Sequence, residues 1–368
     1  MKNTFGSDLS LTIFGESHGR AVGAVLDGMA AGVPVDESFL AACMDKRRAR
    51  GDGLSTPRVE ADAVQLLSGV VNGHTTGTAI ALMIENQNTR SGDYAKTADL
   101  LRPGHADFTA YAKYHGFQDA RGGGHFSGRV TAALVAGGSI VLAALQRAGI
   151  DITTHIARCA GLADTPFALD DPAALAAQVG TLASKTEGFA VLDAAVEEPM
   201  KAAIRAAGAE GDSVGGVLET AILGLPAGIG EPYFDSVESE IAHLAFSIPA
   251  VKGIEFGTGF GFAGLRGSEA NDAFRMTAEG AVVTATTTQA STAASPTGCR
   301  WCSAPPSSPL PASTSSRIRW ITSPKRTRSC PFRGGTTPAS CPGPPLCRPA
   351  PPPLRWAICS PPGTVPGG

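Results

Sequence analysis

The sequence predicts an α+β fold, in which strands and helices form packed layers. Segments with the alternating pattern of strands are mixed with helical patterns, without the regular strand–helix alternation of a doubly wound sheet. The longest helical pattern runs from Ser127 to Ala148 and is largely apolar, which is typical of a buried helix. A chain of 368 residues is also long enough to bury a large core.

The predicted elements follow in chain order from apolar periodicity and from the residues that end each segment. Strands are predicted over residues 9–14, 21–26, 63–71, 78–84, 150–156, 214–223 and 250–256. Helices are predicted over residues 36–48, 127–148, 171–184, 196–207 and 237–246. An Asn72-Gly73 turn is expected to join the paired strands 63–71 and 78–84, and Ser127 is the expected N-cap of the longest helix.

The composition changes abruptly near residue 284. From Ala281 onward the chain contains no Asp, Glu or Asn, yet it holds most of the 27 prolines, all three tryptophans and all but two of the eight cysteines. Residues 285–368 have no apolar periodicity and are expected to form a Pro-rich, disordered tail. Residues 1–284 are expected to form the folded domain.

Charge and composition argue against several classes of protein. The net charge of -3 gives no electrostatic footprint for nucleic acid. The first residues lack the apolar core of a signal peptide, and the longest apolar run is too short for a comfortable membrane span. Cys43 and Cys159 fit a reduced, cytoplasmic protein, and no His/Cys spacing in the first 280 residues indicates a metal site.

The segment Arg102–Arg129 carries the residue types of an anion-binding site. It contains three arginines, three histidines and three consecutive glycines, Gly122–Gly124, called the glycine segment below. Arginines bind phosphate or carboxylate in planar forks, glycines let the backbone approach a ligand closely, and a helix N-terminus favours an anion. A Gly-rich turn with solvated arginines is the alternative that this segment leaves open.

Two histidines lie where an imidazole can act as a general acid near neutral pH. His18 is in the turn Gly15–Gly19 directly after a predicted strand, and His105 lies between Arg102 and Asp107. A single histidine in a loop is more often a surface residue. Together these patterns predict an enzyme with a phosphorylated ligand, but they do not name its reaction.

Seven strings in the first 284 residues carry a resemblance to a known family. They are FGESHG at Phe14, RPGHAD at Arg102, RGGGHFSGR at Arg121, EGDSVGG at Glu210, PAGIGEP at Pro226, SIPAVKGIEFG at Ser247 and LRGSEAND at Leu265. In this order they resemble chorismate synthase from Lys2 to about Thr284. The resemblance implies a β-α-β sandwich, with helices between antiparallel sheets, and a homotetramer.

The resemblance also implies a reaction. A phosphate lyase (carbon–oxygen lyase) at the last common step of the shikimate pathway would serve aromatic amino acid biosynthesis. It would convert 5-enolpyruvylshikimate 3-phosphate to chorismate and phosphate by 1,4-anti elimination. Reduced FMN would be the cofactor, with NADPH required only indirectly for flavin reduction. The implied partner is thus a small molecule, with neither nucleic acid nor a membrane.

By resemblance, individual residues acquire roles. His18 would protonate the leaving phosphate, and His105 would keep the reduced flavin in its working protonation state. Arg47 matches a position that contacts nucleotide or substrate phosphate. The positions that match flavin contacts are His125, Phe126, Ser127, Pro249 and Ala250.

The resemblance ends near residue 284. The family continues with a Gly- and Asn-rich loop, a Lys-Pro-Thr segment for the flavin phosphate and an Arg-His-Asp-Pro-Cys motif, and none of these strings occurs here. Codons for 288–295 and 333–343, regrouped in another frame, can encode the loop and the Arg-His-Asp-Pro-Cys motif. We therefore expect a frameshift near codons 284–288, which leaves the C-terminal elements of the fold missing.

Three alternatives to an active chorismate synthase remain open at this point. The chain can be an inactive frameshifted derivative, because loss of a core segment exceeds typical stability margins. It can be a flavin- or phosphate-binding module without turnover. It can also be a Pro-rich interaction protein, if its tail carries a polyproline recognition motif.

Overall fold

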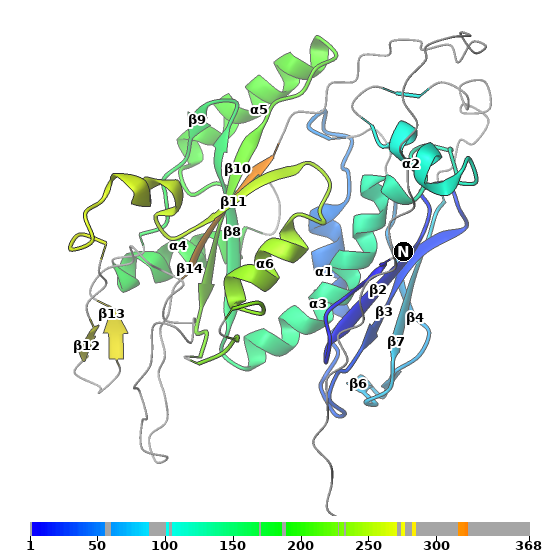
Figure 1. The fold of residues 1–368 in the computed structure, drawn as a ribbon, viewed down its shortest axis with the longest axis horizontal. Coiled ribbons are helices and arrows are strands. Elements are labelled where there is room, and N and C mark those ends of the chain that lie inside the picture. The colour runs from blue at the N-terminus through cyan, green and yellow to red at the C-terminus, as the bar shows by residue number, and fades with distance from the viewer. Residues whose placement is uncertain are drawn as a thin grey trace, which may run out of the picture. The chain divides into compact units, whose positions relative to one another are not determined.

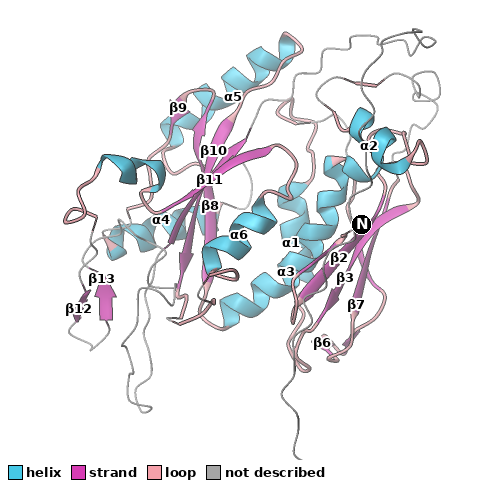
Figure 2. Cartoon of the chain, viewed as in Figure 1, coloured by secondary structure: helices cyan, strands magenta, loops and turns pink. Residues whose placement is uncertain are grey.

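The computed structural model describes residues 2–55, 60–87, 101–102, 105–168, 171–185, 189–226, 228–231, 233–270, 274–276, 282–284 and 316–322. All of these residues belong to one compact unit, Met1–Phe332. They form two five-stranded antiparallel sheets, two small two-stranded sheets and the helices that pack against them (Figures 1 and 2). The predicted α+β class is therefore confirmed.

The first sheet has the strand order β1-β2-β3-β7-β4. Its strands are β1 (Thr4–Phe5), β2 (Ser10–Gly15), β3 (Ala21–Asp27), β4 (Val64–Leu66) and β7 (Ile80–Glu85). Successive side chains of a strand point to opposite faces, so alternate residues of β3 and β7 share one face. The buried residues of that face are Val22, Ala24, Leu26, Ile80, Leu82 and Ile84.

Two helices cover this face of the first sheet. α1 (Glu37–Arg47) contacts α3 (Thr131–Arg147), and α3 contacts β2, β3 and β7. The segment Gly128–Arg147 is long and apolar enough to cross a membrane, but half of it is buried within the protein. Its alanines Ala132, Ala133 and Ala136 are fully buried in the same hydrophobic cluster as the sheet. We therefore assign α3 to the core.

The start of α3 differs slightly from the prediction. Ser127 caps a 3-10 turn, η3 (Gly128–Val130), in which its Oγ accepts a hydrogen bond from the backbone N–H of Arg129 at 3.2 Å. The α-helix then begins at Thr131. A tight turn at a helix N-terminus is common, so the capping residue was predicted correctly and the helix boundary was not.

The second sheet has the order β11-β14-β10-β8-β9. Its strands are β8 (Asp151–Cys159), β9 (Leu162–Ala163), β10 (Gly216–Leu223), β11 (Val251–Phe256) and β14 (Ser316–Thr322). The helices α4 (Pro172–Ser184), α5 (Ala194–Ala209) and α6 (Val237–Ala245) contact β8, β9 and β11, respectively. Each of these helices begins at an Asp or Ser whose side chain accepts from backbone N–H groups of the first turn.

One predicted hairpin is arranged differently. β4 pairs with β7 as expected, with Val64 opposite Ile84. The Asn72-Gly73 turn, however, joins two short strands of its own, β5 (Val70–Val71) and β6 (His74–Thr75). The predicted strand 63–71 is interrupted at Gly69, whose φ of 80° lies in the left-handed region that a regular strand does not use.

β14 lies in the segment for which the sequence predicts disorder. It is antiparallel to β10 on one side and to β11 on the other. Proline cannot donate a ladder hydrogen bond, and residues 312–323 are the longest Pro-free run after Pro296. The expected disorder therefore does not hold for these seven residues. Apart from β14, the tail after Thr284 lies outside the described residues, as do Cys299 and Cys302.

Candidate active site

The loop that carries His18 connects β2 to β3. Gly15, at the end of β2, has a φ of 98°, and a Cβ there would lie 2.3 Å from the carbonyl oxygen of Ala21, so the turn requires glycine. Ser17 and His18 in this loop are buried, with 1% and 9% of their surface exposed. His18 is therefore packed inside the protein, which argues against the alternative of a solvated surface histidine.

The glycine segment holds one side of this loop. The backbone N–H of Ser17 donates to the carbonyl oxygen of Gly124 at 3.0 Å, and the Ser17 hydroxyl donates to the carbonyl oxygen of Arg121 at 3.4 Å. His125 Nδ1 lies 2.8 Å from the carbonyl oxygen of Gly15. Because a carbonyl oxygen can only accept, this nitrogen of His125 carries a proton. His125 thus binds the His18 loop.

His105 lies in a cluster with Arg102 and Asp107, at the start of α2 (Asp107–Tyr114). Arg102 donates to both carboxylate oxygens of Asp107, at 2.8 and 2.9 Å, and His105 Nδ1 lies 2.5 Å from Asp107 Oδ1. Burial raises the pKa of the Asp107 carboxyl, but hydrogen bonds from Arg102 outweigh burial and lower the pKa to about 2.

The charge of Asp107 fixes the orientation of the His105 ring. An ionised carboxylate only accepts hydrogen bonds, so we assign a proton to His105 Nδ1 that it donates to Asp107. The 3.3 Å approach of Arg102 to the same nitrogen is then a contact between two donors, and the shorter carboxylate contact dominates. His105 Nε2 is the nitrogen that remains to exchange a proton with a ligand.

Two adjacent glycines contact the two histidines. A Cβ at Gly122 would lie 2.2 Å from ring atoms of His18, and a Cβ at Gly123 would lie 3.1 Å from Nε2 of His105. Both glycines have positive φ values, 66° and 137°. A side chain at either position would collide with an imidazole or strain the backbone. The structure therefore brings the two predicted histidines, which are far apart in the sequence, to neighbouring residues.

The arginines that the sequence suggests for anion binding are each paired with an aspartate. Arg121 forms a fork with Asp119 at 2.8 and 2.7 Å, and the hydrogen bonds from this side chain lower the pKa of Asp119. Arg102 forms the similar fork with Asp107 described above. A guanidinium group has five N–H donors, and each fork with an aspartate uses two of them. The aspartates orient the forks without using all of their hydrogen bonds.

Arg47 and Arg129 share one buried carboxylate. Asp62 is 4% exposed, and it accepts from Arg47 at 2.6 Å through one oxygen and from Arg129 through the other. Asp62 has a φ of 52°, a conformation that Asp tolerates better than most residues. Burial lowers the pKa of Arg47, whereas the charge of Asp62 raises it. Arg47 is thus held in an ion pair.

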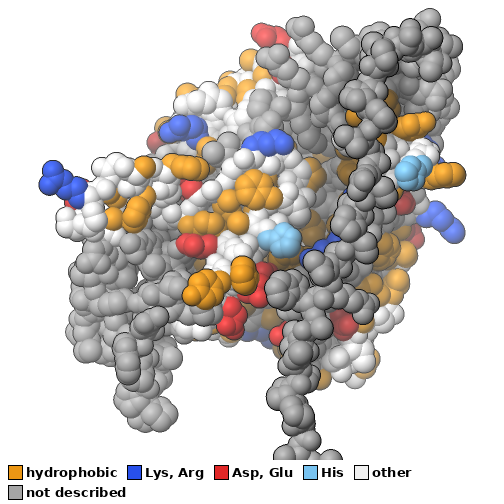
Figure 3. Space-filling view, viewed as in Figure 1, with side chains coloured by type: hydrophobic (Ala, Val, Ile, Leu, Met, Phe, Trp, Pro, Cys, Tyr) orange, Lys and Arg blue, Asp and Glu red, His pale blue; other side chains and the backbone are white. Residues whose placement is uncertain are grey.

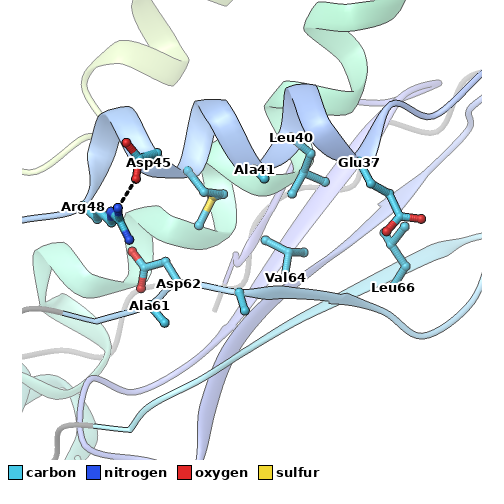
Figure 4. Close-up of a pocket in the computed structure, with 11 residues that line it drawn as sticks. Glu37, Leu40, Ala41, Asp45, Arg48, Ala61, Asp62, Val64 and Leu66 are labelled. Atoms are coloured by element: carbon cyan, nitrogen blue, oxygen red, sulfur yellow. Dashed lines mark ion pairs between the residues drawn. The ribbon is translucent and has the colours of Figure 1, made fainter. Parts of the chain in front are cut away.

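A cavity of about 380 Å³ lies beside this ion pair, between α1 and the segment 61–66 (Figure 4). Leu40, Met44 and Val64 form its apolar wall, and the ion pair between Asp45 and Arg48 lies at its rim. This cavity is therefore not lined by either of the two predicted histidines, His18 and His105.

The remaining predicted flavin contacts fall in two places. Phe126 is 38% exposed, and its ring lies 6.0 Å from that of Tyr114. Ser127 is occupied by its capping hydrogen bond to Arg129. Pro249 and Ala250 lie in the turn between α6 and β11, where Ala250 has a φ of 74°. These two residues directly precede a strand of the second sheet, whereas the histidines lie on segments next to the first.

A second buried polar cluster was missed from the sequence. His155 is fully buried between Asp164 and Glu219, with both ring nitrogens 2.8 Å from a carboxylate oxygen. Burial raises the pKa of Asp164, but backbone N–H groups of Asp193 and Leu192 and the His155 ring lower it overall. His155 and Glu219 are direct partners in the β8–β10 pairing. This cluster joins two central strands and lies inside the second sheet.

Comparison with known proteins agrees with the motifs. The family model described as chorismate synthase matches residues 9–293. The chorismate synthase of Dehalococcoides mccartyi is 43% identical over 279 residues, which are 76% of this chain and 74% of that protein. That of Korarchaeum cryptofilum is 42% identical over 272 residues, 74% of this chain and 73% of that protein. A crystal structure of a chorismate synthase superimposes with a TM-score of 0.65 at 24% identity, covers 86% of this chain and 85% of that one, and shows the same fold. The chain therefore belongs to the chorismate synthase family.

Proposed function

We propose that this chain converts 5-enolpyruvylshikimate 3-phosphate to chorismate and inorganic phosphate by 1,4-anti elimination, as a carbon–oxygen lyase. The observation that carries the proposal is the contact of His18 and His105 with adjacent residues of the glycine segment. Loss of phosphate requires a proton donor and cationic groups near the leaving oxygen. The imidazoles and the guanidinium groups of Arg102 and Arg121 supply both. Family membership favours turnover over a module that only binds flavin or phosphate.

A reduced flavin is proposed to bind beside the glycine segment. The rings of His18 and His105 take the space that Cβ atoms of Gly122 and Gly123 would fill, so the group would lie next to the two imidazoles. Residues of this chain that would hold the group are His125, Phe126, Ser127, Pro249 and Ala250. When bound, reduced FMN would supply electron density that helps the phosphate leave and would accept the proton lost from the substrate, with NADPH acting only through flavin reduction.

The side chains of the chain have separate roles in this proposal. His18, held by its buried loop, donates a proton to the leaving phosphate. Asp107 holds the Nδ1 proton of His105, so that Nε2 controls protonation next to the glycine segment. Arg47 contacts a phosphate with the donors that Asp62 leaves unused. Burial of His18 excludes water from the proton that it transfers.

Turnover measured anaerobically with reduced FMN tests this function. His18→Ala and His105→Ala are expected to lower kcat by about 100-fold or more, the typical contribution of a general acid or base. His74→Ala, at an exposed position on β6, is the matched control and should leave kcat unchanged. Equal rates for all three variants and the unmodified chain would refute the assigned roles.

We also propose that the reading frame shifts near codons 284–288. Two observations support a shift: the match to the family model ends at residue 293, and the tail contains no Asp, Glu or Asn. Sequencing across codons 280–300 tests the proposal. An extra or missing base is expected to restore the Lys-Pro-Thr and Arg-His-Asp-Pro-Cys motifs. A confirmed frame as given would mean that the chain is truncated in effect, and we would then expect no turnover from it.

We further propose that the protein is cytoplasmic and assembles as a homotetramer. Large aromatic residues in the segments before α6 and after β11 are exposed, including Tyr233, Phe234 and Phe260 at 87%, 88% and 83%. Figure 3 shows hydrophobic side chains gathered over α6 and beside it. Exposed apolar patches of this kind are typical of protein–protein interfaces. Light scattering after size exclusion should give four times the mass of one chain, and a monomer would refute the assembly.

A further inference from the structure

Asn86 occupies a junction between the first sheet and the His18 loop. It follows directly after β7, whose last residue is Glu85, and it is half-buried. Its backbone N–H donates to the carbonyl oxygen of Arg20 at 3.1 Å. Its side-chain Nδ2 lies 3.0 Å from the carbonyl oxygen of Glu16 and 3.0 Å from that of Gly19. Asn86 therefore binds residues on both sides of His18.

The orientation of the Asn86 amide is fixed by its partners. Carbonyl oxygens only accept, so the group that faces Glu16 and Gly19 must be the amide NH2. The other end of the amide faces Arg129, whose Nε donates to Asn86 Oδ1 at 2.9 Å. An arginine Nε only donates, so this end must be the oxygen. All three contacts agree, and a flipped amide would lose every one of them.

Arg129 in turn holds Asn86 in place. Arg129 is 8% exposed, and it is paired with Asp62 and also donates to the carbonyl oxygen of Glu85 at 3.3 Å. The position of the Asn86 oxygen is thus set by a buried guanidinium group rather than by solvent. The rigid end of this chain of contacts is the buried Asp62, and the other end is the turn around His18.

The loop is consequently held from two sides. Gly124 of the glycine segment and the adjacent His125 bind it on one side, and Asn86 at the end of β7 binds it on the other. The His18 ring packs against Gly122, where even one added carbon would lie 2.2 Å away. A loop that lost the Asn86 side-chain contacts would keep the glycine side and the 3.1 Å contact between Ser17 Oγ and His18 Nδ1, so the carbonyl oxygens of Glu16 and Gly19 that flank the imidazole would lose their partner on the sheet side.

We propose that Asn86 is a positioning residue for His18, which it orients by clamping the carbonyl oxygens of Glu16 and Gly19. This inference rests on the proposed function, because the role of a correctly placed His18 is to protonate the phosphate. Asn86 itself does not touch the reacting atoms in this proposal. Its effect on turnover passes through the loop.

Two variants separate positioning from simple loss of structure. In Asn86→Asp the carboxylate still accepts from Arg129, but it presents an acceptor to two carbonyl oxygens and repels the loop. Asn86→Ala removes the contact with Arg129 and the contacts with the two carbonyl oxygens. Gln65→Ala is the matched control, because Gln65 is an exposed amide on neighbouring β4 that donates to Glu85 at 3.3 Å and does not contact the loop.

The first measurement does not depend on activity. Diethyl pyrocarbonate acylates accessible imidazoles, and peptide mass spectrometry gives the rate at His18 relative to exposed His74 in the same molecule. Loss of two hydrogen bonds should raise the relative rate at His18 by roughly 10- to 30-fold in both Asn86 variants. Gln65→Ala should leave the ratio unchanged. An unchanged ratio in both Asn86 variants would overturn the proposal.

The second measurement is turnover. Misplacement of a catalytic group by about 1 Å lowers rates by about 100-fold, so kcat should fall in both Asn86 variants while KM changes much less. The pH profile of the residual kcat should lose the limb that His18→Ala also removes. A larger change in KM than in kcat would contradict positioning. If the unmodified chain shows no turnover, the proposed function fails, and the acylation ratio still decides the role of Asn86.

Discussion

Replacing Asp62 with asparagine tests whether a single buried carboxylate stabilises the region around the His18 loop. Asp62 is bonded to both Arg47 and Arg129, and Arg129 is itself buried. Asparagine has nearly the same shape and tolerates the positive φ of this position, so the substitution removes charge without adding backbone strain. Any large effect therefore reports the electrostatic contribution.

The magnitude follows from what remains after the change. Arg129 would keep its contacts with Asn86 and Glu85 but would be a buried cation without a counter-charge. Breaking a buried ion pair from one side costs about 3–5 kcal/mol. With an m-value of about 3 kcal/mol per M, this cost lowers the midpoint of urea unfolding by roughly 1 M or more.

Asp45 provides the matched control. It also binds two arginines, Arg48 and Arg50, but its side chain is 37% exposed, and the side chains of both arginines are partly exposed as well. Exposed ion pairs contribute about 0–1 kcal/mol because water and salt screen them. Asp45→Asn should therefore shift the urea midpoint by a small fraction of the Asp62→Asn shift. Equal shifts for the two variants would refute the argument from burial.

Three further predictions concern single positions. Gly138 lies on the exposed side of α3 with open space around a Cβ, so Gly138→Ala should raise the melting temperature, because alanine favours helix by up to about 1 kcal/mol. Gly137→Ala should not raise it, because its Cβ would lie 2.5 Å from a leucine side chain. Gly123→Ala should abolish most turnover because it pushes a histidine ring aside, while Gly128→Ala, with nothing within 4 Å, should leave kcat unchanged; a similar loss in both would contradict this account. The pKa of Asp107 is about 2 in the folded chain, below its ordinary 3.8, so its carboxylate stabilises the fold above about pH 4 and loses this effect as the pH falls to about 2. The urea midpoints of Asp107→Asn should lack that part of the pH dependence. A pH profile identical to that of the unmodified chain would contradict this stabilising role of Asp107.

The histidines of the site could be predicted from the sequence, whereas the residues that hold them could not. His18 and His105 lie in short strings rich in glycine and charge, which distinguish them from ordinary loops. Asn86 and Asp62 lie in no such string, and each acquires its importance from partners distant in the chain, such as Arg129. The available signal for Asn86 was its position directly after an apolar strand, where a polar residue is ordinary.

The fold shows the same division between local and distant contacts. Helix starts at Asp36 and Asp171 follow from side chains that cap their own first turns, and both were predicted to within about a residue. His155 fell within a strand that was predicted correctly, yet nothing near it in the sequence indicated the two carboxylates that enclose it. Asp164 and Glu219 reach it from a loop and from the paired strand.

At β14, backbone pairing and side-chain identity are separate requirements, although a strand usually meets both. The place between β10 and β11 is filled through backbone hydrogen bonds, and those bonds are the same for every residue except proline. If the reading frame is shifted as we propose, a stretch translated in the wrong frame satisfies these backbone bonds as well as the original stretch would. Such a chain would give the circular dichroism of a paired sheet while carrying none of the side chains that the original codons specified. The presence of β14 as a paired strand therefore does not show which reading frame encodes it.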